Sequence, residues 1–302
     1  MEWEIREGHA LDVLATMAAG SVQTCVTSPP YWGGLRDYGG EVQDWPGVTY
    51  QPMEGVAPVE VPPQRVALGL EANPMDYVGH LVAVFRAGHR VLRDDGTAWV
   101  NLGDCYTDKQ LAAMPWRVGL ALQADGWILR SDIVWSKPNA TPSPVQDRPT
   151  KSHEYVHLIT KRRTYYWNQE GAREPDVGGR PSGNAGRVAS HQPGGRSGIK
   201  TGIPWDAVGE GRNLRSVWSI GTRPHPGHFA TFPPSLPERC VLAATRPGDL
   251  VLDPFVGSGT TAVVAVRQGR RVVGIEQSAA YAEAARRRVE DDAPLFNRSR
   301  VG

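Results

Sequence analysis

Residues 250–276 read LVLDPFVGSGTTAVVAVRQGRRVVGIE, and this stretch decides the fold. It contains a short apolar run, a glycine turn, a run rich in alanine and valine that ends at a glycine, and a second apolar run. We expect a strand at 250–252, a helix at 260–268 and a strand at 271–275. A strand, glycine turn, helix and strand in this order is typical of a mononucleotide-binding βαβ unit.

The residues of this unit favour a nucleoside ligand. Gly257 and Gly259 let the backbone approach a ligand where a Cβ would collide. Glu276 ends the second strand roughly 20 residues beyond the first glycine, the spacing at which a carboxylate can accept hydrogen bonds from both ribose hydroxyls. Because residues 257–262 also fit a loose G-x-G-x-x-G/A pattern, an NAD-dependent oxidoreductase is an alternative.

Two features of this unit favour S-adenosylmethionine over NAD as its ligand. Residues 253–255, Asp-Pro-Phe, stand between the strand and the glycines, where a dinucleotide fold usually runs straight into the turn. Phe255 also offers an apolar face beside the ligand. Both features suit S-adenosylmethionine, which has no pyrophosphate.

A second run, TSPPYW at residues 27–32, follows an expected strand at 22–27. Its two prolines fix φ and remove two backbone donors, so carbonyl oxygens and the Ser28 hydroxyl remain as hydrogen-bond acceptors. Tyr31 and Trp32 add flat aromatic faces. Hydrogen-bond acceptors beside an aromatic ring suit the exocyclic amino group of a stacked base. The alternative interpretation is purely structural: a proline-rich end of a strand with packed aromatic side chains.

Together these runs resemble the β class of amino-methylating DNA methyltransferases, in which the catalytic motif precedes the cofactor motif. The family's catalytic motif, (D/N/S)-P-P-(Y/F/W), is matched by Ser28, Pro29, Pro30 and Tyr31. The resemblance implies S-adenosylmethionine as the cofactor, bound by Asp253, Phe255, Gly257, Ser258, Gly259, Thr260, Glu276 and His228. One departure is His9, where many relatives have aspartate in Gly-Asp-Ala-Leu.

The resemblance also implies the reaction. The methyl group would pass to an exocyclic amino group of a base flipped out of double-stranded DNA. In the family, Ser-Pro-Pro-Tyr is associated mostly with N4 of cytosine, so we expect a cytosine-N4 enzyme and keep N6 of adenine as the alternative. Ser28 Oγ and the Pro29 carbonyl would accept the amino hydrogens, and Tyr31 would stack on the base. A homodimer and a separately acting restriction endonuclease are further partners that the family allows.

Composition restricts the other classes of protein. The 302 residues are 40% hydrophobic and 22% charged, which is typical of soluble globular proteins. The N-terminus has no apolar signal core and no stretch approaches membrane-spanning length, so we expect a cytoplasmic protein without a membrane partner. The three cysteines, Cys25, Cys105 and Cys240, are too dispersed for a zinc site or disulfide framework. No Pro-Cys pair is present, which disfavours carbon-5 cytosine methylation by a cysteine nucleophile.

Strand and helix signals alternate along the chain, as in a doubly wound, mostly parallel α/β sheet. We expect one Rossmann-like methyltransferase domain over residues 1–302, with inserted loops. Further strands are expected at 97–102, 132–136 and 155–160, and further helices at 74–92, 111–124, 236–245 and 278–289. Ser235 is the expected N-cap of the helix at 236–245, and Gly96 is expected in a turn.

Two stretches interrupt this alternation. Residues 33–66 are rich in glycine and proline and are expected to form a long loop, which the resemblance places beside the catalytic pocket. Residues 171–215 combine arginines with glycines, which predicts a target-recognition region although the net charge of the chain is only +1. The side chains expected to contact DNA are Trp32, Arg36, Arg187, Arg196 and Arg212.

Overall fold

The computed structural model describes residues 2–34, 41–174, 212–222, 232–292 and 298–299. The chain divides into two compact units. The first unit consists of residues 1–168 and 216–302, and the second of residues 169–215. The elements named below belong to the first unit, and none of the described helices is long and apolar enough to cross a membrane.

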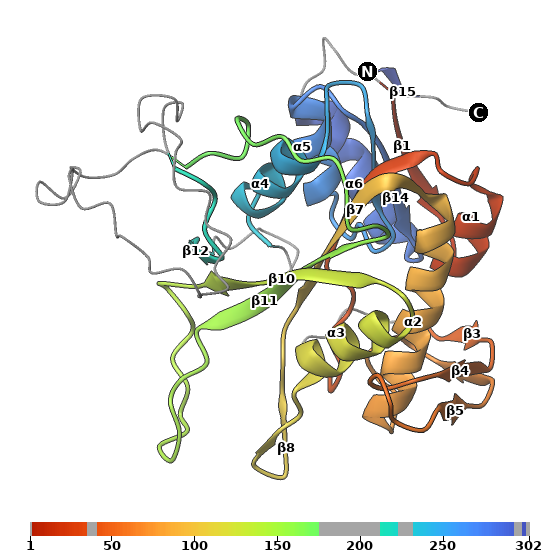
Figure 1. The fold of residues 1–302 in the computed structure, drawn as a ribbon, viewed down its shortest axis with the longest axis vertical. Helices are drawn as coiled ribbons and strands as arrows, with labels where there is room; N and C mark the ends of the chain where they lie inside the picture. Colours follow the sequence, from red (N-terminus) through yellow and green to blue (C-terminus); the bar gives the residue numbers. More distant parts are fainter. Residues whose placement is uncertain (1, 35–40, 175–211, 223–231, 293–297, 300–302) are drawn as a thin grey trace, which may run out of the picture. The chain divides into compact units, whose positions relative to one another are not determined.

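A nine-stranded sheet forms the centre of the first unit (Figure 1). Its strands are β1 (Glu2–Glu7), β2 (Val22–Thr27), β7 (Leu92–Leu102), β10 (Ile128–Ser136), β11 (His153–Thr160), β12 (Val217–Ser219), β13 (Leu250–Asp253), β14 (Arg271–Glu276) and β15 (Arg298–Ser299). They lie in the order β12-β10-β11-β7-β2-β13-β14-β1-β15. Among these strands only β11 is antiparallel to its neighbours, so the expected mostly parallel α/β sheet is confirmed.

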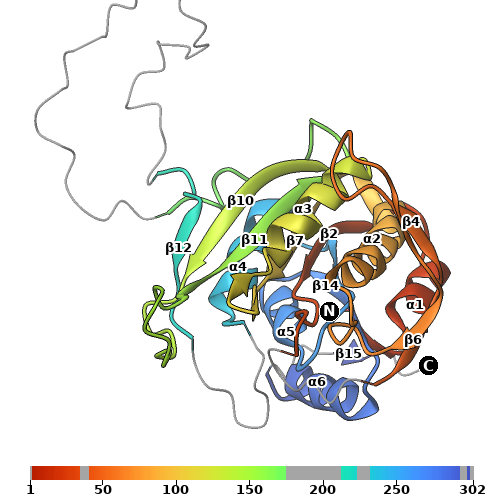
Figure 2. The same ribbon diagram turned by 90° about the horizontal axis from the view of Figure 1, so that it is seen from below.

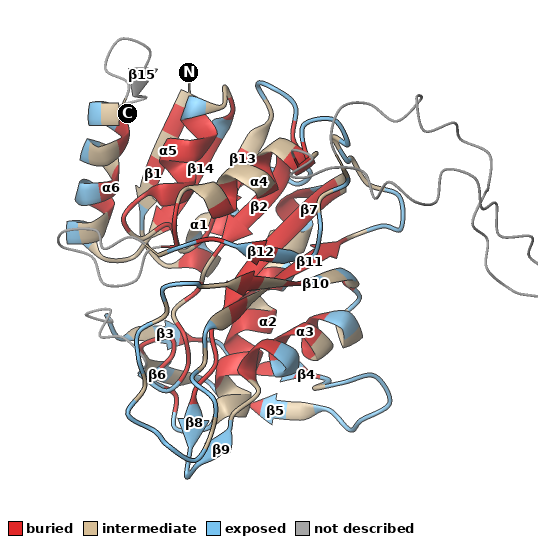
Figure 3. Cartoon of the chain, turned by 90° about the vertical axis from the view of Figure 1, so that its left-hand side faces the viewer, coloured by how far each residue is buried: buried red, intermediate tan, exposed pale blue. Residues whose placement is uncertain are grey.

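Helices cover both faces of the sheet (Figure 2). One face carries α1 (Ala10–Thr16), α2 (Pro74–Val91) and α3 (Met114–Ala124), which pack side by side. The other face carries α4 (Ser235–Ala244), α5 (Thr260–Arg267) and α6 (Ala279–Asp292). All six residues of β2 are consequently buried, whereas α6 buries only one side (Figure 3).

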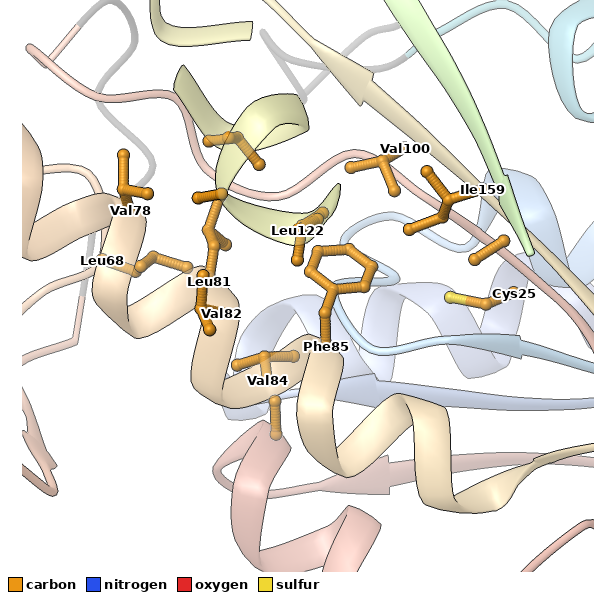
Figure 4. Close-up of a cluster of buried hydrophobic side chains, with 14 of the residues drawn as sticks. Cys25, Leu68, Val78, Leu81, Val82, Val84, Phe85, Val100, Leu122 and Ile159 are labelled. Atoms are coloured by element: carbon orange, nitrogen blue, oxygen red, sulfur yellow. The ribbon is translucent and has the colours of Figure 1, made fainter. Parts of the chain in front are cut away.

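The core between α2, α3 and the sheet is apolar (Figure 4). Phe85 of α2 and Leu122 of α3 belong to one buried cluster with Val100 of β7 and Ile159 of β11. Cys25 of β2 is part of the same cluster, and Cys240 is buried in α4, so both are thiols of the core.

The order of the strands places the two motifs together. From β2 the chain proceeds outward to β7, and from β13 it proceeds in the opposite direction to β14. Strands β2 and β13 are parallel neighbours, so the carboxyl ends of both lie at the same edge of the sheet. Ligands of open α/β sheets bind outside the carboxyl ends at such a switch point.

Several local predictions are wrong. Residues 33–66 include four short strands that pair as two hairpin-like ladders: β3 (Gln43–Trp45) with β6 (Gln64–Val66), and β4 (Val48–Tyr50) with β5 (Val59–Val61). The helix expected at 111–124 begins at Met114, because β8 (Tyr106–Thr107) and β9 (Gln110–Leu111) form a ladder before it.

Two residues expected at element boundaries lie inside elements. Ser235 is the first residue of α4 rather than its N-cap, because Pro234 already has helical φ and ψ. Gly96 lies within β7 at a shift of its register with β2. A Cβ at Gly96 would lie 2.8 Å from the Gln23 carbonyl oxygen, so glycine is needed there for close packing of the backbone.

Candidate active site

A pocket opens at the carboxyl edge of β2, β13 and β14. Ser28 and Pro30 line one side of it, directly after β2. Of the residues predicted to bind the cofactor, Phe255, Gly257, Ser258, Thr260 and Glu276 line it. The structure therefore brings both sequence motifs to one cavity, as their strand ends predict.

Asp253 joins the two motifs from beneath the pocket. Its buried carboxylate accepts a 2.6 Å hydrogen bond from Thr27 Oγ1, a residue 226 positions away in the chain. It also accepts a 3.1 Å bond from the Phe255 backbone N–H, which shapes the start of the glycine turn. Burial raises the pKa of Asp253 to about 6, although these hydrogen bonds oppose the rise.

Glu276 lies in the wall of the pocket with both carboxylate oxygens held by the backbone. One oxygen accepts the Gly257 N–H at 2.9 Å, and the other accepts the Ser278 N–H at 3.0 Å. Burial raises the pKa of the Glu276 carboxyl above its ordinary value. Each oxygen retains a lone pair for a ligand hydroxyl, so the geometry allows the ribose contact that the sequence predicts.

Gly259 of the cofactor motif serves the packing of the helices. It adopts a left-handed φ of 84° at the N-cap of α5, a conformation that favours glycine. A Cβ there would lie 3.1 Å from the Cβ of Ala285 in α6. Gly259 therefore lets α5 pack closely on α6, and it is not among the residues that line the pocket.

The catalytic motif is held by hydrogen bonds below the pocket. The Pro30 carbonyl accepts a 2.7 Å bond from the Tyr77 hydroxyl, which anchors the turn to α2. The Ser28 hydroxyl donates to the Tyr31 hydroxyl at 3.2 Å, and Tyr31 donates to Glu154 at 2.6 Å. Tyr31 is only 6% exposed, and its predicted stacking on a base remains a prediction.

Sequence reasoning missed three polar residues beneath Ser28: Asn101, Lys137 and Glu154. Asn101 Nδ2 donates to the Tyr31 hydroxyl at 2.7 Å and to Glu154 at 2.9 Å, and Lys137 forms an ion pair with Glu154. One sequence signal was available, since Glu154 is the only acidic residue of strand β11. A charge at a buried strand position usually marks a special partner.

His9 caps a helix where many relatives of the expected family have aspartate. Its Nδ1 accepts a 3.2 Å bond from the Leu11 N–H at the start of α1. Burial lowers the pKa of His9, which keeps the ring neutral as a capping acceptor must be. The neighbouring residues Gly8 and Ala10 line the pocket. His9 therefore caps α1 beside the pocket.

The expected DNA contacts are only partly described. The Trp32 indole is buried and donates a 2.8 Å bond to the Glu71 carbonyl, so it supports the catalytic turn from below. In the second unit, Arg212 and Arg215 both donate to Glu174, at 3.2 Å and 2.8 Å. Arg36, Arg187, Arg196 and His228 lie outside the described residues. DNA binding remains a prediction for Trp32, Arg36, Arg187, Arg196 and Arg212, and cofactor binding remains a prediction for His228.

Comparison with known proteins agrees with this geometry. The model of the N6/N4 methyltransferase family, described as DNA methylase, matches residues 22–287. The chain is 39% identical to the Type II methyltransferase M.Cfr9I of Citrobacter freundii, over 95% of this chain and 87% of that protein. It is 38% identical to the Type II methyltransferase M.SmaI of Serratia marcescens, over 93% and 89% of the two chains.

Solved structures share the fold. The structure of the PvuII DNA methyltransferase, described as cytosine-N4-specific, has a TM-score of 0.65 at 20% identity and matches 99% of this chain and 94% of that one. The modification methylase TTHA0409 of Thermus thermophilus in complex with S-adenosyl-L-methionine has a TM-score of 0.62 at 22% identity, over 97% and 95% of the two chains.

The raised pKa of Asp253 predicts a pH-dependent stability. The folded protein holds this proton more tightly than the unfolded chain, so the stabilisation is complete below the ordinary pKa of 3.8 and is lost as the pH rises to about 6. In urea unfolding between pH 4 and 6, Asp253→Asn should remove a slope of at most about 1.4 kcal/mol per pH unit from the free energy of unfolding. Parallel curves for the parent and the variant would contradict the raised pKa.

Proposed function

Because this chain belongs to the N6/N4 DNA methylase family, we propose that it transfers a methyl group from S-adenosylmethionine to N4 of cytosine in double-stranded DNA. The chain is an S-adenosylmethionine-dependent DNA methyltransferase, so the NAD-dependent oxidoreductase considered above is excluded. The observation that carries the cytosine-N4 proposal is Ser28, a neutral acceptor at the pocket in a Ser-Pro-Pro-Tyr motif. The description of the PvuII enzyme as cytosine-N4-specific supports this choice.

The pocket residues fit the methyl donor. Glu276 is a carboxylate with two oriented oxygens that could accept the ribose hydroxyls. Phe255 offers an apolar surface, and the Thr27–Asp253 bond keeps the cofactor turn beside the catalytic turn. Bound S-adenosylmethionine supplies the electrophilic methyl group on its sulfonium.

The protein side of the reaction consists mainly of positioning. The amino nitrogen of cytosine is a poor nucleophile because its lone pair is delocalised into the ring. An N–H bond accepted by Ser28 Oγ, with a second accepted by the Pro29 carbonyl, would draw that lone pair out of conjugation and direct it at the methyl group. The target base must leave the stack to reach Ser28, and the methylated nitrogen then loses a proton.

The biological setting follows from the relatives. M.Cfr9I and M.SmaI are Type II methyltransferases, and we assign the same type to this chain. We propose that it protects its target sequence from a separately acting endonuclease. Residues 171–215, which belong to the second compact unit, are the proposed target-recognition region because they concentrate arginines in a glycine-rich segment.

The first prediction concerns the product. DNA from cells that express the chain should contain N4-methylcytosine in nucleoside mass spectrometry. Ser28→Ala should lower the methylation rate by roughly 100-fold, because it removes one preorganised hydrogen-bonding group, while cofactor affinity stays near the parental value. Ser21→Ala, the same change at the other end of β2, is the control and should keep parental activity. Detection of N6-methyladenine alone would reject cytosine, and detection of 5-methylcytosine would reject amino methylation.

The second prediction concerns the cofactor. Glu276→Ala should weaken S-adenosylmethionine binding in calorimetry by about 1.5–3 kcal/mol, since a charged acceptor of paired hydroxyls is lost. Glu276→Gln should lie between this variant and the parent, because the amide keeps one acceptor oxygen. Glu283→Gln, an exposed change on α6, should bind as the parent does. Parental affinity in Glu276→Ala would show that the ribose is held elsewhere.

The third prediction concerns recognition. Of the variants Arg187→Ala, Arg196→Ala and Arg212→Ala, at least one should weaken methylation at the target by roughly 1–3 kcal/mol without loss of cofactor binding. Since Arg212 also pairs with Glu174, Glu174→Gln is its control and should have the smaller effect if Arg212 contacts DNA. Deletion of residues 178–202 without any change in site choice or DNA affinity would place recognition in another region.

A further inference from the structure

A buried polar network connects Ser28 to an ion pair outside both motifs. Tyr31 and Asn101 lie between the Ser28 hydroxyl and the Glu154 carboxylate, and Lys137 pairs with the other oxygen of Glu154. The Glu154 side chain is 8% exposed and that of Lys137 is 13% exposed. Neither member of this pair lines the cofactor pocket.

An ionised carboxylate accepts hydrogen bonds and cannot donate them, and this determines the direction of the chain of bonds. Because Glu154 accepts, the Tyr31 hydroxyl must donate its only hydrogen to Glu154. The Tyr31 oxygen then presents lone pairs alone, so the Ser28 hydrogen points to Tyr31. One lone pair of Ser28 Oγ accepts the Asn101 N–H at 3.3 Å, and the other is left to accept an amino N–H.

Glu154 also orients the amide of Asn101. The amide nitrogen faces Glu154 at 2.9 Å, the Tyr31 hydroxyl at 2.7 Å and Ser28 Oγ at 3.3 Å. A flipped amide would place its carbonyl oxygen against the carboxylate, which is repulsive. Asn101 Oδ1 has no hydrogen-bond partner among the described residues. The hydrogen bonds of Nδ2 therefore determine the orientation of the Asn101 amide.

The cost of burying these charges indicates a function beyond stability. A buried ion pair must offset the loss of hydration of both groups, and an apolar pair of similar size is often as stable. Burial opposes ionisation of Glu154, yet Lys137 and the hydrogen bonds from Tyr31 and Asn101 hold its pKa below the ordinary value. The Lys137 ammonium also lies 4.4 Å from the ring centroid of Trp135. The network thus keeps Glu154 negative at neutral pH.

The packing keeps Tyr31 in the network. A Cβ at Gly103 would lie 2.4 Å from Cε2 of the Tyr31 ring, so the ring rests directly against the backbone after β7. Asn101 is fixed in β7 and Glu154 in β11, which are neighbouring strands of the sheet. The distance between the ion pair and Ser28 is therefore set by strand register rather than by a loop.

We propose that Glu154, held by Lys137, is a positioning residue for methyl transfer, which orders the hydrogens of Tyr31, Asn101 and Ser28 so that Ser28 Oγ presents a lone pair to the target amino group. The proposal rests on the proposed function. It assigns Glu154 no contact with the substrate.

The test uses Glu154→Gln, which keeps the shape of the side chain but can donate as well as accept. Both directions of the hydrogen-bond chain then become available, and kcat for transfer of labelled methyl groups to DNA should fall roughly 10- to 100-fold. KM for DNA and Kd for S-adenosylmethionine should stay within about twofold of the parent, since neither ligand touches Glu154. Asp292→Asn, which breaks the ion pair between Arg267 of α5 and Asp292 of α6, is the control and should keep the parental kcat.

Two double variants distinguish positioning from a structural role. In a Tyr31→Phe background, Glu154→Gln should reduce kcat by much less than in the parent, because the connecting hydroxyl is gone. Lys137→Met combined with Glu154→Gln leaves no uncompensated buried charge, so it should recover the Tm lost in the single variant without recovering kcat.

The outcomes separate the hypotheses. Parental kcat in Glu154→Gln, equal losses in both backgrounds, or recovery of kcat together with Tm would each overturn the positioning role. A parent protein that transfers no methyl group to DNA would instead overturn the proposed function. An active parent with an unaffected Glu154→Gln variant rejects only this inference.

Discussion

The hydrogen bond from Thr27 to Asp253 is the contact on which the active site depends. Each residue ends a parallel strand, β2 or β13, and the bond closes the gap between two turns that the chain makes far apart. Asp253 also accepts the Phe255 N–H, so one carboxyl sets the distance between the turns and the shape of the cofactor turn. A methyl donor and an acceptor base bound at these turns would consequently meet at a separation fixed by strand pairing.

The two buried carboxyls near the site have opposite electrostatic surroundings. Asp253 has neutral hydrogen-bond donors and a raised pKa, whereas Glu154 has the Lys137 ammonium and a lowered pKa. A group that holds a turn needs only acceptor geometry, and a partly protonated carboxyl supplies it. A group that must impose one direction on a chain of hydroxyls needs a permanent charge.

The sheet and both motifs could be predicted from the sequence because their signals are local. A strand signal that stops at Ser28 or Asp253 predicts both the strand and the position of a functional residue at its carboxyl end. Glu154 and Asn101 could not be connected in this way, since their meeting depends on the pairing of β7 with β11. The strands within 41–66 were missed because each has three residues, too few for an alternating pattern to stand out from a glycine- and proline-rich background.

The position of the second unit in the chain has an evolutionary consequence. The chain leaves the sheet after β11, where Asn168 bonds to the Ala243 carbonyl, and returns at β12, where Trp218 is fully buried. Both ends of the intervening segment are therefore fastened to the catalytic unit by its own core. A segment fastened at both ends can change in length without a change in the register of the catalytic strands. With the recognition role proposed for it, such a change would alter sequence specificity without rebuilding the chemistry.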